Sequence, residues 1–406
     1  MKDDIFTTAD ILLPNGISPE KWSVIACDQF SSELDYWERV RDYVDSEPST
    51  LNMIIPEAYL NGINIEQKAN DIRMEMERCI NGSALREVKD SFVYVERTLT
   101  DGRIRRGLVG AVNLDDYDFT SSSASVLASE GTVLDRLPAR INVRRAVPLE
   151  LPHIMAFIDD AGNTVIEPIA DKAAKHALPL LYDFELMEQG GHIRGFRVSG
   201  KDANAVLDSL RDLHRDNDTL MVIGDGNHSL AAAKVFWDEI KTGLGSSEYK
   251  THLSGKALLE VNNVYDPAIS FEAIHRVVFD ADNADLLQAF SKAMPKGNDY
   301  ELCWLSQGET GIIGVSATCI GDMLAAVQEF IDDYVNKTGC LVDYIHGEDA
   351  VRKLALERGC FGLILPSMDK SELFATVKNS GVFPKKSFSV GHARDKRYYL
   401  ECRRIS

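Results

Sequence analysis

A chain of 406 residues is longer than one hydrophobic core usually organises, so its length predicts two compact units or one elaborated domain. Its 45% hydrophobic and 26% charged residues are typical of a globular protein and argue against disorder. The net charge of -19 repels nucleic acid and anionic membrane surfaces, so neither is an expected partner. A phosphorylated ligand would need a local pocket of backbone amides, a metal ion or a few cations.

The cysteines and the apolar runs indicate where the protein works. Seven cysteines are scattered without a C-x-x-C pair, which is typical of reduced thiols and of neither a disulfide framework nor a zinc site. The first residues lack an apolar signal core, and no apolar run has the length of a membrane span. We therefore expect a cytoplasmic protein, and the sequence leaves open whether it is a homo-oligomer.

The first half of the chain alternates strand-like and helix-like segments. Residues 22–27 form an apolar run that predicts a buried strand ending at Asp28-Gln29, and residues 68–80 have the period of a helix. Residues 91–99 and 103–114 alternate like the two strands of a hairpin about an Asp-Gly turn. Residues 151–169 predict two further strands about an Asp-Asp-Ala-Gly-Asn turn.

In the second half, a helix is predicted at residues 202–213, a strand at 219–223, a helix at 230–240 and a strand at 257–262. Beyond residue 280 helices and strands alternate more evenly. The sequence therefore predicts a mixed α/β (α+β) fold, with a β-rich core over residues 1–280 and a C-terminal α/β subdomain over residues 281–406.

The strongest functional candidate is the Gly224–Ser229 turn between a buried strand and a helix. The amides of a helix N-terminus attract an anion, and Gly224 and Gly226 let the backbone approach a ligand. Asn227 or Ser229 is expected to cap the helix. The glycines match only the first two of G-x-G-x-x-G, which argues against a dinucleotide fingerprint. A capped turn without a ligand is the alternative.

Asp225 and His228 supply the chemistry of this turn. Asp225 can hold a metal ion or accept a proton, and His228 can donate to a phosphoryl oxygen. Serine hydrolysis is disfavoured because the chain has no G-x-S-x-G elbow.

Three other segments are weaker candidates. In Ser129–Thr132 the carboxylate of Glu130 can act as a general base, although a helix-capping role is the commoner one. Asp28-Gln29 follows a predicted strand and either faces a cleft or forms an Asx turn. Lys385, within Pro384–Ser387, either meets a phosphate or is simply solvated.

These motifs, in this order, resemble the DUF1015 family over nearly the whole chain. The family has an Asp-Gly-His-His-Arg turn after a strand, which corresponds here to Asp225–Ser229. It also has an upstream His-Glu-x-Thr segment and a Pro-x-Lys-Ser segment near the C-terminus, which correspond to Ser129–Thr132 and Pro384–Ser387.

The Asp-Gly-His-His-Arg turn in turn resembles the phosphate-handling turn of the ParB/sulfiredoxin superfamily, which includes free-serine kinases that use ATP, ADP or pyrophosphate. The resemblance implies a ParB/sulfiredoxin-like mixed core. It also implies that Asp225 and His228 sit at the transferred phosphate, with Mg²⁺ held by Asp225, and that Glu130 activates the serine hydroxyl. The phosphate-binding set would be Gly224, Gly226, Asn227, Ser229, Thr132, Arg136 and Lys385.

Two residues depart from the family turn. Asn227 replaces the first histidine, and Ser229 replaces the arginine, which removes a bidentate phosphate clamp. Either another cation takes over, or this branch binds a different phosphoryl donor or none. The candidate cations are Arg136, Lys234, Arg276 and Lys385.

The sequence thus predicts a Mg²⁺-dependent phosphotransferase that moves a phosphoryl group from ATP, ADP or pyrophosphate to a small hydroxyl metabolite, with L-serine favoured. One alternative is a ParB-like nucleotide-binding regulatory protein without kinase activity. The other is a metal-assisted phosphohydrolase.

Overall fold

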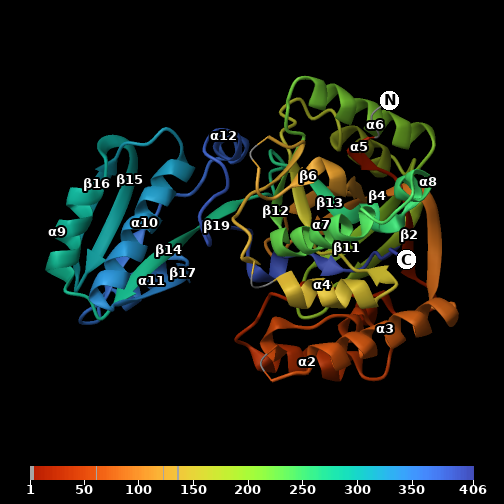
Figure 1. The fold of residues 1–406 in the computed structure, drawn as a ribbon, viewed down its shortest axis with the longest axis horizontal. Coiled ribbons are helices and arrows are strands. Elements are labelled where there is room, and N and C mark those ends of the chain that lie inside the picture. The colour runs from red at the N-terminus through yellow and green to blue at the C-terminus, as the bar shows by residue number, and fades with distance from the viewer. Residues whose placement is uncertain (1–3, 61, 122, 135–136) are drawn as a thin grey trace. The chain divides into compact units, whose positions relative to one another are not determined.

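The computed structural model describes residues 4–60, 62–121, 123–134 and 137–406, and these residues divide into two compact units (Figure 1). Unit 1 takes the described residues of Met1–Ala128, Thr132–Ile269 and His392–Ser406. Unit 2 is formed by Ser129–Gly131 and Ser270–Gly391. The main stretch of unit 2 therefore begins before the boundary expected near residue 280, and the chain returns to unit 1 after Gly391.

A large mixed sheet forms the centre of unit 1. Its strands among the described residues are β1 (Phe6–Thr7), β2 (Ala9–Pro14), β4 (Leu85–Thr98), β5 (Ile104–Asn113), β6 (Tyr117–Asp118), β7 (Val126–Ala128), β9 (Met155–Ile158), β10 (Leu180–Glu185), β11 (His192–Val198), β12 (Met221–Asp225) and β13 (Lys256–Asn263). The order is β10-β11-β4-β5-β13-β9-β12-β7-β6, with β1 on β5 and β2 on β4. Because β12 runs parallel to β7 and antiparallel to β9, the sheet is mixed.

The β4–β5 hairpin confirms the prediction for residues 91–114. The two strands pair antiparallel, and the turn between them holds Gly102 at a φ of +85°, which glycine adopts without strain. Successive side chains of β4 enter different cores, since a strand points its side chains to alternate faces. Phe92 and Tyr94 belong to one core, and Val93 and Val95 to the other.

Helices cover both faces of this sheet. The helices of unit 1 are α1 (Pro19–Trp22), α2 (Leu34–Val44), α3 (Ile65–Asn81), α4 (Leu137–Ala146), α5 (Glu167–Ala174), α6 (Lys201–Arg215), α7 (Asn227–Lys241) and α8 (Ser246–Thr251), with short 3-10 turns at Thr50–Met53, Glu57–Tyr59, Leu114–Asp116, Leu253–Gly255 and Ala393–Asp395. α5, α6 and α7 supply residues to one core, and α2 and α3 to the other. α4 packs beside α7 and α3 (Figure 1).

The C-terminal segment closes unit 1 with two short strand pairs. β20 (Tyr398–Tyr399) pairs with β3 (Val24–Ile25), and β21 (Arg403–Arg404) pairs with β8 (Leu149–Glu150). Residues far apart in the sequence therefore meet beside α4 and α7.

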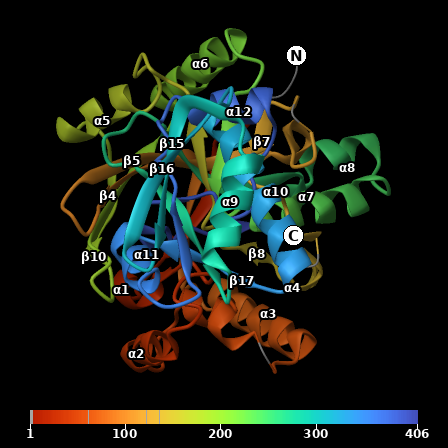
Figure 2. The same ribbon diagram turned by 90° about the vertical axis from the view of Figure 1, so that its left-hand side faces the viewer.

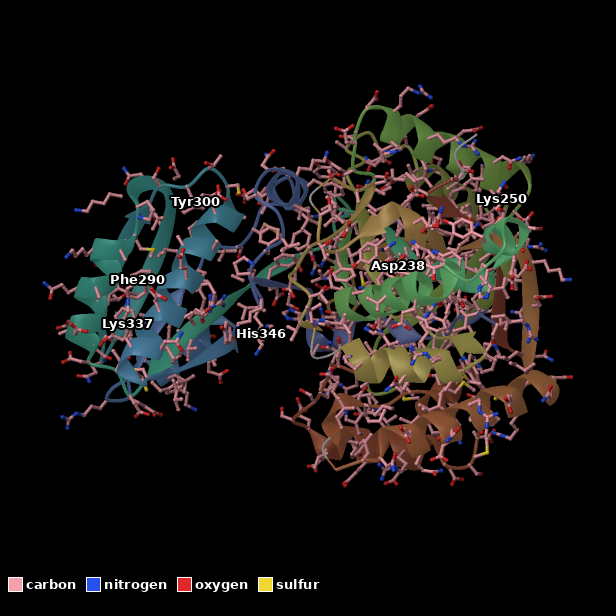
Figure 3. All side chains as sticks on the ribbon, viewed as in Figure 1. Asp238, Lys250, Phe290, Tyr300, Lys337 and His346 are labelled. Carbon is pink, nitrogen blue, oxygen red and sulfur yellow. The ribbon has the colours of Figure 1, made fainter. Side chains whose placement is uncertain are left out.

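Unit 2 is a second α/β layer arrangement. Its strands are β14 (Phe271–Phe279), β15 (Lys296–Ser306), β16 (Glu309–Val315), β17 (Leu341–His346), β18 (Phe361–Ile364) and β19 (Phe388–Val390), and its helices are α9 (Asn283–Ala293), α10 (Ile320–Thr338), α11 (Glu348–Leu354) and α12 (Glu372–Asn379). The sheet order is β16-β15-β18-β14-β17, with β19 on β14. α9 and α10 lie together on one side of this sheet, and α11 lies on the other (Figure 2). The Phe290 ring of α9 is buried against Phe330 of α10 (Figure 3).

One local prediction is wrong, and another is confirmed only in part. Residues 151–169, all described, contain one strand, β9, and then α5, because the Asp160 carboxylate accepts hydrogen bonds from the amides of Thr164 at 2.6 Å and Val165 at 2.9 Å and so fixes a turn. The apolar run 22–27 is shared between α1 and the two-residue β3. Helix α1 begins at Pro19, a residue that favours the first helical position.

The length and hydropathy of a helix decide whether it can span a membrane. In the part of the chain that the structure describes, none of the helices combines the length and the apolar character that crossing a bilayer requires. The helices and strands of both units make the chain a mixed α/β protein with a large mixed sheet.

Candidate functional site

The Gly224–Ser229 turn joins β12 to α7. Gly226 has a φ of +77° and is the N-cap residue of α7, so the N-cap position itself offers no side chain to cap the helix. Asn227 and Ser229 therefore lie inside the helix, and the expectation that one of them caps it is wrong. The cause is the left-handed conformation of Gly226, which starts the helix one residue earlier than a side-chain cap would.

Both glycines of the turn make room for the neighbouring β9 segment. A Cβ atom at Gly226 would lie 2.9 Å from the Cα atom of Ile154, and one at Gly224 would clash with the Phe157 ring. The chain needs glycine at these positions so that β12 can pack closely on β9. Steric packing alone thus accounts for a pattern that also resembles a ligand-binding turn.

Asp225 forms an ion pair that the sequence did not reveal. Its Oδ2 atom lies 3.0 Å from Lys396 Nζ, and the side chains are only 16% and 9% exposed. Its Oδ1 atom accepts a hydrogen bond of 2.8 Å from the Gly226 amide. The carboxylate is thus held at the N-terminus of α7, with an ammonium group beside it.

His228 faces the segment that follows Gly131. Its Nε2 atom accepts a hydrogen bond of 3.1 Å from the Val133 amide, so Nε2 carries no proton and the ring proton is on Nδ1. Thr132 Oγ1 is buried and has no hydrogen-bond partner among the described residues. The structure therefore brings His228, Thr132 and Val133 together at the first turn of α7.

Asp28 lies in the same electrostatic environment as Lys396. Its Oδ2 atom is 3.9 Å from His153 Nε2. Burial alone would raise the pKa of the Asp28 carboxyl. His153, the Gln29 amide and Lys396 together lower this pKa by more than burial raises it, so the net pKa lies below its usual range. Asp28, at the end of the β3 segment, thus stays ionised beside a histidine.

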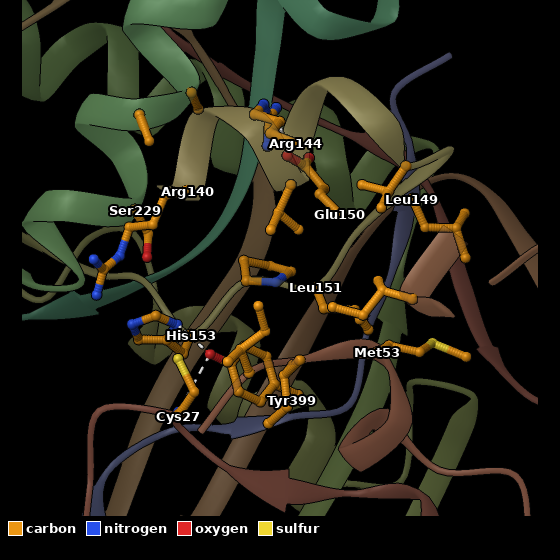
Figure 4. Close-up of a pocket in the computed structure, with 18 of the residues that line it drawn as sticks. Cys27, Met53, Arg140, Arg144, Leu149, Glu150, Leu151, His153, Ser229 and Tyr399 are labelled. Carbon is orange, nitrogen blue, oxygen red and sulfur yellow. Dashed lines mark hydrogen bonds and ion pairs between the residues drawn. The ribbon is translucent and has the colours of Figure 1, made fainter. Parts of the chain in front are cut away.

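Tyr399 links this histidine to Cys27. The Tyr399 hydroxyl lies 2.9 Å from His153 Nδ1 and accepts a hydrogen bond of 3.3 Å from the Cys27 amide (Figure 4). Burial raises the pKa of the Cys27 thiol to about 12. Cys27 is therefore a protonated, weakly nucleophilic thiol at neutral pH.

Several other predicted site residues belong to unit 2 or pair within their own helix. Glu130 and Lys385 belong to unit 2, as does Arg276, which is buried and donates to Gln328. Lys234 pairs with Asp238, labelled in Figure 3, at 3.0 Å. Arg136 lies outside the described residues. Of the cations near the turn, Lys396 is the one that sequence reasoning missed, and no local motif marked it.

A protein metal site needs several ligand side chains close together. Within the described ranges, no group of three or more His, Cys, Asp and Glu side chains is arranged to hold a metal ion. Asp225 alone could contribute one carboxylate to a magnesium ion whose other ligands are water and phosphate oxygens.

Comparisons with known proteins place these observations in context. The fold is similar to that of free serine kinase in complex with AMP, at 11% sequence identity and a TM-score of 0.38, covering 71% of this chain and 90% of that chain. It is similar to SbnI with C-terminal truncation from Staphylococcus aureus, at 10% identity and a TM-score of 0.37, covering 70% and 82%. It is also similar to a conserved hypothetical protein from Pyrococcus furiosus, at 11% identity and a TM-score of 0.35, covering 71% and 92%.

No protein with curated function matches the sequence. Residues 13–396 match the family model described as protein of unknown function (DUF1015). The motifs of the turn and of the two flanking segments predicted this match, and the chain therefore belongs to the DUF1015 family.

Proposed function

We propose that this chain is a phosphotransferase that moves a phosphoryl group from ATP, ADP or pyrophosphate to the hydroxyl of a small metabolite, with L-serine as the favoured acceptor. The observation that carries the proposal is the pairing of Asp225 with Lys396 at the N-terminus of α7. The ParB/sulfiredoxin-like character of the turn comes from its sequence motif, and the choice of L-serine rests on the same motif.

Positive charge at this turn suits a phosphoryl group. The N-terminus of α7, a helix of 15 residues, carries partial positive charge, and the Lys396 ammonium, paired with Asp225, lies beside it in a position shielded from water. A lysine acts on phosphate as a point charge, whereas the arginine of the family turn would act as a bidentate clamp. Lys396 can thus supply the cation that Ser229 does not.

Asp225 would play two roles in this proposal. It orients the Lys396 ammonium, and it would provide the single protein carboxylate for Mg²⁺, since magnesium in such sites is often held by one or two carboxylates together with substrate phosphates. Bound there, the ion would neutralise charge on the phosphoryl oxygens. His228, whose Nε2 atom accepts from the Val133 amide, lies in the first turn of α7 and would steady a phosphoryl oxygen there.

The reaction balances as follows. The bond from the transferred phosphorus to the bridging oxygen of the donor breaks, a bond from phosphorus to the acceptor hydroxyl oxygen forms, and the hydroxyl proton passes to a base. The sequence resemblance assigns that base to Glu130, and this assignment stays a prediction. Positioning and charge neutralisation supply most of the rate in this kind of chemistry.

The test is a transfer assay with purified chain, Mg²⁺, L-serine and each of ATP, ADP and pyrophosphate, with O-phosphoserine measured by ³¹P NMR and mass spectrometry. We expect transfer with at least one donor, and a loss of about 100-fold or more in kcat/KM for Lys396→Met, typical of losing one charge-stabilising group. Lys172→Met is the matched control. It removes an ion-paired lysine of α5, which contacts Asp202 at 2.6 Å, and should leave the rate unchanged.

Other outcomes would contradict the kinase assignment. Tight nucleotide binding without any turnover by folded protein would support the regulatory alternative. Release of inorganic phosphate without a phosphorylated acceptor would support a phosphohydrolase.

A further inference from the structure

A partly open cavity of about 210 Å³ lies in unit 1, where α3, α4 and α7 surround β8 and the segments around Cys27 and Tyr399. Figure 4 shows its two sides: Met53, Leu149 and Leu151 form an apolar side, whereas His153 and Tyr399 present polar atoms from the other. A small molecule with a hydrocarbon body fits such a wall.

The cavity wall also carries an unbalanced buried charge. Glu150 Oε1 accepts a hydrogen bond of 2.6 Å from Arg403 Nε, and Glu150 Oε2 lies 2.9 Å from Arg144 Nη2. The side chains of Arg403 and Glu150 are each 6% exposed, and that of Arg144 is 13% exposed. Two guanidinium groups thus share one carboxylate, which leaves one positive charge uncompensated within this trio.

Glu150 is ionised in this arrangement. Burial alone would raise the pKa of its carboxyl. Arg403 and Arg144 lower this pKa by more than burial raises it, so the net pKa lies below its usual range. Because Glu150 is deprotonated at neutral pH, the trio of Arg403, Glu150 and Arg144 has a net charge of one positive unit.

Arg144 is the group that a ligand can reach. It lines the cavity together with Glu150, and Figure 4 shows the two side chains next to each other at the wall. Its Nη2 atom is ion-paired with Glu150 Oε2, and both Nη2 and Nε are shielded from the cavity. Nη1 is not among these buried atoms, so it is the part of the guanidinium that a ligand can contact. A ligand that accepts from Nη1 would be stabilised, because a hydrogen bond from a charged guanidinium is stronger than a neutral one.

The second arginine of the wall is already neutralised. Arg140 Nη2 donates a hydrogen bond of 2.6 Å to Glu57 Oε1. The two charges cancel, so this pair does not alter the excess at Arg144.

We propose that this cavity binds a small carboxylic acid, with its carboxylate on Arg144 and a branched or aromatic hydrocarbon body against the apolar side. A carboxylate can accept a charge-assisted hydrogen bond from Nη1, and it balances the positive charge left over where Arg144 and Arg403 share Glu150. Ser229 of the turn also lines this cavity, but neither Asp225 nor Lys396 does, and the proposal does not depend on phosphoryl transfer.

Binding to the whole chain tests the proposal. Isothermal titration and saturation-transfer NMR would be recorded with 4-methylpentanoate and phenylacetate, and with the neutral amides of the same two acids. We expect each acid to bind at least 10-fold more tightly than its amide, because a charge-assisted pair in a buried site adds about that much.

Matched variants separate the charge from the fold. Arg144→Met should reduce the affinity of each acid at least 10-fold and leave that of the amides nearly unchanged. Arg145→Met is the control: Arg145 neighbours Arg144 on α4, but its side chain is 53% exposed and pairs with Glu239 at the surface, so acid binding should be retained. If Arg144→Met does not fold, Val143→Phe, which fills the cavity from α4, should abolish binding of both acids and amides.

Three results would overturn the proposal. These are equal affinity for acids and amides, equal loss of acid binding in the Arg144→Met and Arg145→Met variants, and absence of binding by any of the four probes to folded wild-type chain.

Discussion

Replacing Lys396 with methionine should destabilise unit 1. The Asp225 carboxylate would lose the ammonium and keep only the Gly226 amide as a hydrogen-bond donor, in a position that water reaches poorly. Nζ and Oδ2 are 3.0 Å apart, and the two side chains are 9% and 16% exposed. At an effective dielectric constant of about 20, unit charges about 3 Å apart attract each other by about 5 kcal/mol, and desolvation of the two groups cancels much of this. We expect the free energy of unfolding to fall by about 2 kcal/mol.

A double-mutant cycle isolates the pair. Lys396→Met, Asp225→Asn and the combined variant would be unfolded in urea and followed by tryptophan fluorescence, which reports mainly on unit 1 because Trp22, Trp37 and Trp237 are buried there and Trp304 alone lies in unit 2. The combined variant should be more stable than the sum of the two single losses predicts, by about 1–3 kcal/mol.

The refuting result is equally definite. If both single variants lie within about 0.5 kcal/mol of the wild type and the coupling energy is below about 0.5 kcal/mol, the pair is not an energetically significant contact. The assignment of Lys396 as the cation of the turn would then lose its support.

Three further predictions concern the backbone and pH. Gly226→Ala, at a φ of +77° and with a close neighbour, should lower the unfolding free energy by about 2 kcal/mol or more, whereas Gly200→Ala, at a φ of +57° with nothing within 4 Å, should lower it by about 1 kcal/mol, both measured in urea. The net pKa of Asp28 is lowered in the folded chain, because nearby groups outweigh burial. The stability that ionised Asp28 contributes is therefore present above about pH 4 and is lost as pH falls through the folded pKa. The difference in unfolding free energy between the wild type and Asp28→Asn should shrink between pH 6 and pH 3. Burial lowers the pKa of His275 below its ordinary value of 6.5, so the stability that neutral His275 contributes to unit 2 is present above about pH 6.5 and is lost as pH falls through the folded pKa. Hydrogen exchange of the β14 amides is the readout, and His275→Asn should flatten this dependence.

Local patterns were sufficient for the elements whose own residues decide their structure. The alternation of residues 91–114 and the Asp-Gly turn predicted the β4–β5 hairpin, and the helical period of residues 230–240 predicted most of α7. The start of α7 could not be predicted, since it depends on the left-handed backbone of Gly226 against Ile154 of another strand. The strand expected after β9 failed because Asp160 captures two backbone amides that periodicity does not reveal.

The candidate site was predicted only in part for a similar reason. Asp225 and His228 stand in one motif, so spacing found them together. Lys396 reaches Asp225 across 171 positions of the chain, and its surroundings in the sequence resemble those of any surface lysine. His153 and Tyr399 are likewise joined across 246 positions. Contacts of this kind are fixed by tertiary packing, which one sequence does not display.

The return of the chain to unit 1 after Gly391 has a consequence for biosynthesis. Lys396, Tyr399 and Arg403 all lie in this last segment, and each completes a polar contact with a residue made much earlier, Asp225, His153 and Glu150 respectively. On the ribosome, all strands of the large sheet are translated before Lys396, Tyr399 and Arg403 are made. A nascent chain stalled within unit 2 would therefore lack both the turn's lysine and the arginine that anchors the cavity wall.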